Sequence, residues 1–229
     1  MLYSAFGFQG QKCSACSRAI ILESVYDTFT ERLADAVRSM IVGPSSDPSS
    51  FVGPVIDDVA CDRLNRVIDE AKRECRLLAQ ASLEDTPTQR RANGYYVLPT
   101  VFVDVPRQHF IIQNELFGPI LALLKVKDFG EAIKVANDSE FGLTGAIFSR
   151  SPQNIETARK EFRVGNLYIN RGSTGALVMR QPFGGAKMSG VGSKAGGPDY
   201  LLQFVIPKAI SENTMRRGFA PNDSAKTQP

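Results

Sequence analysis

The sequence is poor in the two side chains that most often build disulfide scaffolds and metal sites. It contains four cysteines and a single histidine, His109, in 229 residues. Four cysteines are too few for a disulfide framework, so a reducing, cytoplasmic setting is the simpler expectation. A zinc site would need further ligands, because Cys61 and Cys75 stand far from His109 in the sequence. We therefore expect no bound metal.

Long apolar runs and a one-sided charge are missing as well. No stretch of about 18 apolar residues occurs, so no membrane span is expected. Residues 1–10 have neither a basic region nor a long apolar core, and they do not resemble a secretory signal. The net charge is only +3, with lysines and arginines interleaved with acids rather than gathered in a stripe. This pattern does not favour nucleic acid as a partner.

The composition that remains is that of an ordinary globular protein. Hydrophobic residues make up 43% and charged residues 22% of the chain, which is close to the average. A chain of this length can bury a sizeable core. Its low net charge and frequent aliphatic residues exclude disorder over most of its length.

Strand-like and helix-like stretches alternate along the chain, which predicts an α/β domain with a mainly parallel sheet. Apolar spacings of three and four follow Ser24, and Ser24 with Asp27 resembles a capping box. The Gly-rich, aperiodic region Arg171–Asp199 is typical of functional loops, and the polar tail beyond Ser211 is expected to be disordered. The expected strands are Arg18–Leu22, Tyr95–Val105, Ile120–Val126, Leu143–Ser149, Gly165–Asn170 and Leu201–Ile206; the expected helices are Ser24–Met40, Asp57 to about Ala81, Gly130–Asn137 and Pro152–Arg163.

Cys13 stands among glycines, small residues and a lysine, and three interpretations are open from these residues alone. It is a candidate nucleophile, because a helix N-terminus or a nearby cation lowers the pKa of a thiol. Composition alone favours a buried, inert cysteine, which is common in proteins. A redox pair with Cys16 is the third interpretation, but it needs a thioredoxin-like strand, motif and helix that this layout does not match.

Three other features have a functional and a structural interpretation. Gly190–Ala195 matches the G-x-G-x-x-G/A dinucleotide pattern, but no apolar strand leads into it and no helix follows, so we reject it. His109 is a possible general base, although a lone histidine on a β-rich stretch is more often structural. Glu115 could accept hydrogen bonds from a sugar diol, whereas an exposed loop carboxylate is the favoured interpretation from sequence alone.

Three segments, in the correct order, resemble motifs of the aldehyde dehydrogenase superfamily. Gly10–Cys13 resembles the nucleophile loop, Glu115–Pro119 the E-x-F-G-P motif, and Pro182–Gly190 the P-F-G-G-x-K-x-S-G motif. The resemblance covers residues 6–212 and is to the C-terminal half of the family. It implies a catalytic domain over residues 1–199 with a mainly parallel sheet, lacking most of the N-terminal NAD-binding domain. It also implies an oligomerisation strand over residues 200–211, followed by a disordered tail over 212–229.

Finer details resemble one branch of the family, L-glutamate γ-semialdehyde dehydrogenase, also called 1-pyrroline-5-carboxylate dehydrogenase. These details lie in Phe6–Arg18, Ser173–Ala176 and Gln181–Gly185. The branch carries out the second step of proline catabolism with NAD, either alone or fused to proline dehydrogenase. Another semialdehyde dehydrogenase is the alternative.

The resemblance implies roles for individual residues. Cys13 would be the nucleophile that attacks the aldehyde, and its backbone N–H would be one oxyanion donor. Glu115 would bind the nicotinamide-ribose hydroxyls, and Phe117 would pack beside the nicotinamide. Cys16 would be structural.

The same resemblance implies a site for the substrate, glutamate semialdehyde. Ser14, Gly175 and Ala176 would hold its α-carboxylate, and Phe183 would pack on its methylene chain. The carboxylate site is physically reasonable, because a hydroxyl and two successive N–H groups among small residues can approach an anion closely.

The family's NAD-binding domain, oxyanion asparagine and water-activating glutamate lie upstream of the nucleophile, and none of them fits within Met1–Lys12. We therefore expect negligible dehydrogenase activity from this chain alone, and activity with a separate N-terminal half. One alternative is a non-catalytic module that associates with full-length subunits. Another is a weak thiol esterase that uses Cys13 without NAD. The intact enzyme is expected to be a homo-oligomer.

Overall fold

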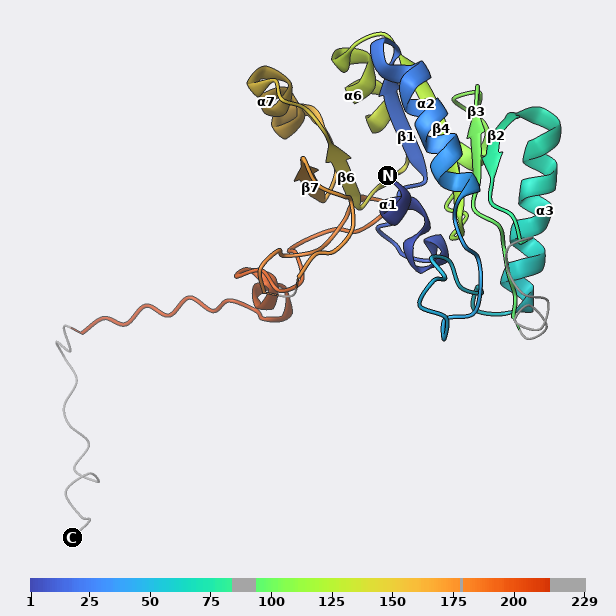
Figure 1. Ribbon diagram of the computed structural model, residues 1–229. Helices are drawn as coiled ribbons and strands as arrows, with labels where there is room; N and C mark the ends of the chain where they lie inside the picture. The colour runs from blue at the N-terminus through green and yellow to red at the C-terminus, as the bar shows by residue number, and fades with distance from the viewer. Residues whose placement is uncertain (84–93, 178, 215–229) are drawn as a thin grey trace.

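A computed structural model describes residues 1–83, 94–177 and 179–214 of the chain (Figure 1). The polar tail that the sequence predicts to be disordered lies, from residue 215 onward, outside the described residues. No helix in the described ranges is long and apolar enough to cross a membrane.

A four-stranded sheet forms the centre of the fold, in the order β1–β4–β3–β2. Both β1 (Arg18–Leu22) and β3 (Thr100–Val103) run parallel to the central strand β4 (Ile120–Val126), and β2 (Arg76–Gln80) pairs antiparallel to β3. All residues of β4 except Lys125 are buried, as expected for a central strand covered on both faces. The predicted α/β class with a mainly parallel sheet is confirmed.

Alternate residues of β3 and β4 enter two separate cores, because successive side chains of a strand point to opposite faces. One core packs against α3 (Asp58–Glu74) and the short α5 (Phe110–Gln113); the other packs against α2 (Glu23–Arg38) and α1 (Leu2–Phe6). The first core takes Phe102, Ala122 and Leu124, and the second takes Val101, Val103, Leu121 and Leu123.

A second group of elements lies on the far side of α6 (Phe129–Asn137) from the sheet (Figure 1). In it, β6 (Thr144–Ile147) and β7 (Asn166–Ile169) pair in parallel, and α7 (Pro152–Glu161) connects them. This is a small βαβ unit. Ile133 of α6 shares a small core with Ile147 and Ala158 of this unit, so the unit is packed against α6.

The remaining elements are short. The 3-10 helix η1 (Gly7–Gly10) follows α1, and β5 (Phe141–Gly142) pairs antiparallel with β8 (Ala186–Lys187). A second 3-10 helix, η2 (Tyr200–Phe204), begins the C-terminal stretch of the described chain, which extends away from the fold in Figure 1.

Three sequence predictions about local structure are corrected. The helix expected from Asp57 to about Ala81 ends at Glu74, because Cys75 is extended and the following residues pair with β3 as strand β2. The strand expected over Leu201–Ile206 is instead largely η2, with exposed side chains, and it pairs with no strand among the described residues. Leu22 is the N-cap of α2 and makes no side-chain cap bond, so Ser24 and Asp27 form no capping box.

Candidate functional site

The loop of residues 7–17 contains the Gly10–Cys13 motif and is called the nucleophile loop below. Part of it is held in an unusual backbone conformation. Phe8, Gln9 and Gly10 have φ angles of 59°, 58° and 66°. Left-handed conformations are costly for residues other than glycine, and they persist only where the surroundings enforce them. The backbone N–H of Ile56 donates to Oε1 of Gln11 at 3.1 Å, which helps to fix the turn from outside.

The second half of the loop is tied to α1. The N–H of Cys16 donates to the carbonyl of Ser4 at 2.8 Å, and the N–H of Ala15 donates to the carbonyl of Lys12 at 3.0 Å. Cys13 lies inside the turn that the Lys12–Ala15 bond closes, and it is exposed. The chain then enters β1 rather than a helix, so the thioredoxin-like layout required for a redox pair is absent here.

The other three cysteines are in environments that suppress thiolate formation. The Sγ atom of Cys16 is 3.4 Å from the carbonyl oxygen of Arg18, and burial raises the pKa of Cys16 to about 11. Burial also raises the pKa of Cys61 and Cys75. The structure therefore offers Cys13 as the exposed thiol and makes Cys16 a structural residue.

We expect a thiol-specific alkylating reagent to modify Cys13 first and Cys16 much later. Near pH 8 a thiol whose pKa is about 11 is roughly one-thousandth thiolate, so Cys16 should react on the order of a hundredfold more slowly than a free cysteine thiol, whereas Cys13 is exposed to the reagent. The labelling of Cys16 should accelerate as the pH rises toward that pKa. Peptide mapping by mass spectrometry follows each cysteine, and a Cys13→Ser variant should lose the fast phase. Equal labelling rates for Cys13 and Cys16 would contradict this assignment.

The loop of residues 114–119, which carries the E-x-F-G-P motif, lies against the nucleophile loop. A Cβ atom at Gly10 would be 2.4 Å from the carbonyl oxygen of Gly118, so only glycine allows this approach. Within the loop Leu116 is buried, and Arg63 donates to the Leu116 carbonyl at 2.7 Å. Phe117, which is 40% exposed, stands in a left-handed conformation.

Glu115 is exposed like Phe117, on the other side of the buried Leu116. The core therefore holds the middle of this loop and leaves a carboxylate and an aromatic ring accessible. Their loop adjoins the one that carries Cys13.

A third loop, residues 170–176, contacts the nucleophile loop from the β7 side. The hydroxyl of Ser173, which is buried, donates to the carbonyl of Ser14 at 3.3 Å. Arg171 donates to the carbonyls of Thr174 and Gly175 at 3.3 and 3.1 Å. The structure thus brings together the loops of Ser14, Gly175 and Ala176, the three predicted carboxylate ligands.

Phe183 is attached to a different part of the structure. Its backbone pairs with Ala195 at 3.0 and 2.9 Å. The side chain of Asn166 in β7 donates to the carbonyl of Pro182 at 2.8 Å and accepts from the N–H of Gly184 at 3.1 Å. These bonds fix Phe183 to β7 rather than to the loops that carry Cys13 and Glu115. Its proposed packing on the substrate stays a prediction.

Sequence reasoning missed the residues that hold the loops in place. Arg63 of α3 bonds to the carbonyl of Leu116, Asn166 of β7 to the carbonyl of Pro182, and Arg171 to carbonyls of its own loop. The residue type of an arginine or asparagine does not indicate which carbonyl it will reach, so the sequence alone offered no signal for them.

Two other candidates are resolved by their surroundings. His109 is buried, accepts from the N–H of Ile111 at 3.3 Å and has Nε2 at 2.9 Å from a carboxylate oxygen of Glu74, so it caps α5 and is structural. No α-helix begins at the glycines of Gly190–Ala195, and Ala195 forms a bridge to Phe183. Within the described ranges, no group of three or more His, Cys, Asp or Glu side chains is placed to hold a metal ion.

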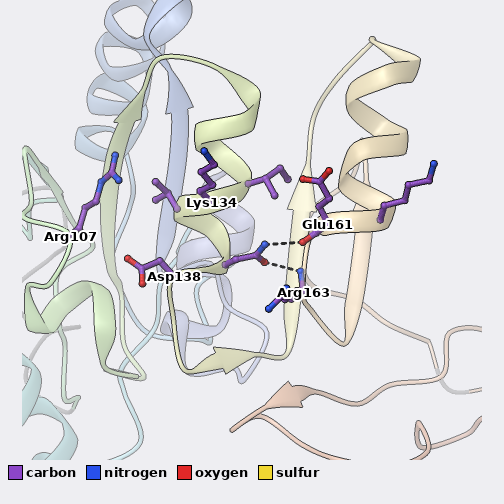
Figure 2. Close-up of a pocket in the computed structure, with 9 residues that line it drawn as sticks. Arg107, Lys134, Asp138, Glu161 and Arg163 are labelled. Atoms are coloured by element: carbon purple, nitrogen blue, oxygen red, sulfur yellow. Dashed lines mark hydrogen bonds between the residues drawn. The ribbon is translucent and has the colours of Figure 1, made fainter.

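A cavity of about 640 Å³ lies between α6 and α7 (Figure 2). It is open, its lining contains no cysteine or serine, and it is lined by charges of both signs, so it does not resemble the site around Cys13. Its charged lining residues are Arg107, Lys134, Asp138, Lys160, Glu161 and Arg163.

Comparison with known proteins gives consistent matches over most of the chain. Residues 1–210 match the model of the aldehyde dehydrogenase family. The chain is 51% identical over 209 residues to a 1-pyrroline-5-carboxylate dehydrogenase of Geobacillus sp. (strain WCH70), covering 91% of this chain and 39% of that protein. It is 45% identical over 212 residues to the protein of that name in Bacillus subtilis (strain 168), covering 93% and 40%.

Solved structures agree with these relatives. Proline utilization A from Bdellovibrio bacteriovorus is 50% identical with a TM-score of 0.86, covering 96% of this chain and 22% of that one. A 1-pyrroline-5-carboxylate dehydrogenase from Thermus with bound NAD is 44% identical with a TM-score of 0.80, covering 89% and 38%. The chain thus spans 39 to 40% of the length of the Geobacillus and Bacillus relatives.

Proposed function

Because this chain belongs to the aldehyde dehydrogenase family, we propose that it carries the nucleophile and the aldehyde-binding part of an enzyme that oxidises L-glutamate γ-semialdehyde to glutamate with NAD. One observation carries the proposal: the loop of exposed Cys13 contacts both the loop of Glu115 and Phe117 and the loop of residues 170–176. The names of the relatives support this substrate.

Cys13 has the first role in the reaction. Its thiolate adds to the aldehyde carbon and forms a thiohemiacetal, whose oxygen the backbone N–H of Cys13 stabilises. After oxidation, water releases glutamate from the thioester and restores the thiol. The aldehyde carbon is oxidised by loss of a hydride, for which NAD would be the acceptor, and water supplies the second oxygen of the new carboxylate.

The residues present fit the nicotinamide end of NAD. An exposed carboxylate and an exposed ring, held beside the nucleophile loop, suit a ribose diol and a flat nicotinamide. Glu115 would accept hydrogen bonds from the ribose hydroxyls, and Phe117 would pack beside the ring. When bound, NAD supplies a hydride acceptor. We assign the rest of the cofactor site, and the base that activates water, to the portion of the relatives that this chain does not span.

The substrate's α-carboxylate would lie between the nucleophile loop and the loop of residues 170–176. The Ser14 hydroxyl and the N–H groups of Gly175 and Ala176 are suitable donors, because no bulky side chain blocks an anion there. Arg171 already uses its guanidinium on the carbonyls of this loop. It therefore shapes the loop, and the donors to the anion are the smaller groups.

A second function, association with other subunits, is supported by a separate observation. Leu201, Leu202, Phe204, Val205 and Ile206 are each at least 60% exposed. Exposed apolar side chains in one segment mark interaction surfaces. Residues 200–211 would pair with full-length subunits or with copies of this chain in a homo-oligomer. The reducing, cytoplasmic setting remains part of the proposal, since Cys13 must stay a free thiol to act.

The proposed function is tested by mixing this chain with the separately expressed upstream part of the Geobacillus relative. We expect NADH formation from glutamate semialdehyde with the mixture and none with either part alone. Turnover by this chain alone would contradict the division of roles. Turnover with other semialdehydes but not this one would favour the alternative substrate.

Replacing Ser14 by alanine tests the carboxylate site in the same mixture. Loss of a hydrogen bond to a charged group costs about 1.5 kcal/mol or more, so KM for glutamate semialdehyde should rise about tenfold. KM for an uncharged aldehyde such as butanal should stay unchanged. Ser17→Ala is the matched control, because Ser17 is an exposed serine of the same loop. An equal effect on both aldehydes would remove Ser14 from the carboxylate site.

A further inference from the structure

Two basic side chains from distant segments converge on the C-terminal end of α6. The guanidinium of Arg18 donates to three backbone carbonyls there, at 3.1 to 3.5 Å. The ammonium of Lys187 donates to two more, at 2.7 and 2.8 Å. Together they bind five successive carbonyls: Arg18 takes those of Val135, Ala136 and Asp138, and Lys187 takes those of Asn137 and Ser139.

This is an uncommon way to end a helix. The last four carbonyls of a helix lack partners within it, and a glycine in the left-handed conformation often completes the end. Here the C-cap residue, Asp138, has φ −80° and ψ 73°, so that motif is absent. Cations are favoured at this negative end of the helix dipole. Partial burial of the Arg18 guanidinium is costly unless it is fully hydrogen-bonded, and this burial lowers the pKa of Arg18. Lys187 is exposed, and contact with the protein partly desolvates its ammonium and lowers its pKa as well.

A third segment joins the same helix end. The side chain of Asn137 donates to the carbonyl of Glu161 at 2.8 Å and accepts from the N–H of Arg163 at 2.8 Å (Figure 2). These bonds fix the link between α7 and β7 to the last residue of α6.

Each of these three segments leads directly to part of the candidate site. Arg18 begins β1, immediately after the nucleophile loop. Lys187 lies in the same motif as Phe183. The Arg163 side of the junction continues through β7 into the loop of residues 170–176. The end of α6 is therefore a place where all three site segments are held, in addition to their direct contacts with one another.

We propose that residues 135–139 form a joint that sets the positions of the nucleophile loop, the loop of residues 170–176 and the Phe183 segment relative to one another, with Arg18 and Lys187 as positioning residues. The catalytic consequence rests on the proposed function, whereas the mechanical coupling does not. A pair of purely local helix caps would stabilise α6 without linking the segments to one another.

The test is amide hydrogen exchange on the full chain, comparing Lys187→Met with Lys134→Met. Lys134 is the matched control, because it is a lysine of the same last helical turn with its side chain on the cavity wall. We expect Lys187→Met to accelerate exchange about tenfold in residues 182–190 and also, across the joint, at the N–H groups of Ala15 and Cys16. Lys134→Met should leave both unchanged. Faster exchange confined to residues 182–190 and α6 would contradict the proposal that residues 135–139 couple the three segments.

Arg18→Met gives the reciprocal measurement, and Arg18→Lys guards against a variant that fails to fold. Either should accelerate exchange in residues 182–190, from which Arg18 is distant in the sequence. In the mixed enzyme, Lys187→Met should also raise KM for glutamate semialdehyde several-fold more than Lys134→Met does. If hydrogen exchange changes as expected but the unsubstituted mixture shows no activity, the proposed coupling through residues 135–139 stands and the proposed function is contradicted. If hydrogen exchange does not change, the coupling is refuted whatever the activity of the mixture.

Discussion

Replacing Cys13 by serine is expected to lower NADH formation from glutamate semialdehyde by roughly a thousandfold or more in the mixed enzyme. A serine hydroxyl is a far weaker nucleophile than a thiolate unless a neighbouring base activates it, and loss of a nucleophile removes the covalent route altogether. Cys13 is the exposed thiol of the chain, on a loop that two other loops contact. The measurement is the initial rate of NADH absorbance at saturating substrate.

Cys16→Ser is the matched control for this prediction. It removes a thiol three positions away that has a pKa of about 11 and a hydrogen bond to the Arg18 carbonyl. We expect it to retain most of the activity and to show a modest loss of stability. If Cys13→Ser kept its rate while Cys16→Ser lost it, the assignment of the nucleophile would be wrong.

Replacing Gly10 by alanine is expected to lower the free energy of unfolding by about 3 kcal/mol, because it adds both a steric clash and backbone strain. The new Cβ would be 2.4 Å from the carbonyl oxygen of Gly118 and 3.0 Å from that of Ala5, and both contacts are backbone. Overpacking of this kind typically costs about 1–3 kcal/mol, and the left-handed φ of 66° adds about 1–2 kcal/mol for a residue with a Cβ. Urea unfolding followed by circular dichroism measures the change.

Gly130→Ala is the control for the glycine prediction. Gly130 lies in α6, where the nearest atom to an added Cβ is a side-chain oxygen of Asp128 at 3.3 Å. Alanine is the better helix former, and the contact is with a single side-chain atom of the cap, so this variant should change the stability by far less than Gly10→Ala does. An unfolding midpoint for Gly10→Ala equal to that of Gly130→Ala would show that the backbone of Gly10 does not approach that of Gly118 so closely.

The sequence predicted the regular parts of the fold because their apolar patterns are strong. Arg18–Leu22 and Ile120–Val126 are strands with the predicted bounds, and Asp57 caps its helix through the N–H of Ala60. The failures have tertiary causes. Residues 76–80 continue an apolar helical pattern, but the edge of β3 offers them backbone partners, and pairing outweighs the local preference.

The candidate site was predicted as a set of residues and not as an arrangement. The roles of Cys13, Glu115 and Phe117 were predicted from motifs that resemble those of the family, whereas the residues alone favoured an inert cysteine and an exposed loop carboxylate. The placement of the three loops depends on single contacts between residues far apart in the chain, such as Ser173 with Ser14 and Gly10 with Gly118. The Lys187 contact to the end of α6 is of the same kind, since nothing in its motif indicates which helix it meets.

The pairing of β1 with β4 has a consequence for the order in which this protein acquires its shape. Arg18 pairs with Ala122 and Leu22 with Val126, so the first strand finds its parallel neighbour only after a long intervening stretch has been synthesised. Pairings this remote along the chain are slow to form, and the waiting strand is open to association with other chains. Cys13, just before that strand, therefore gains its surroundings late in folding.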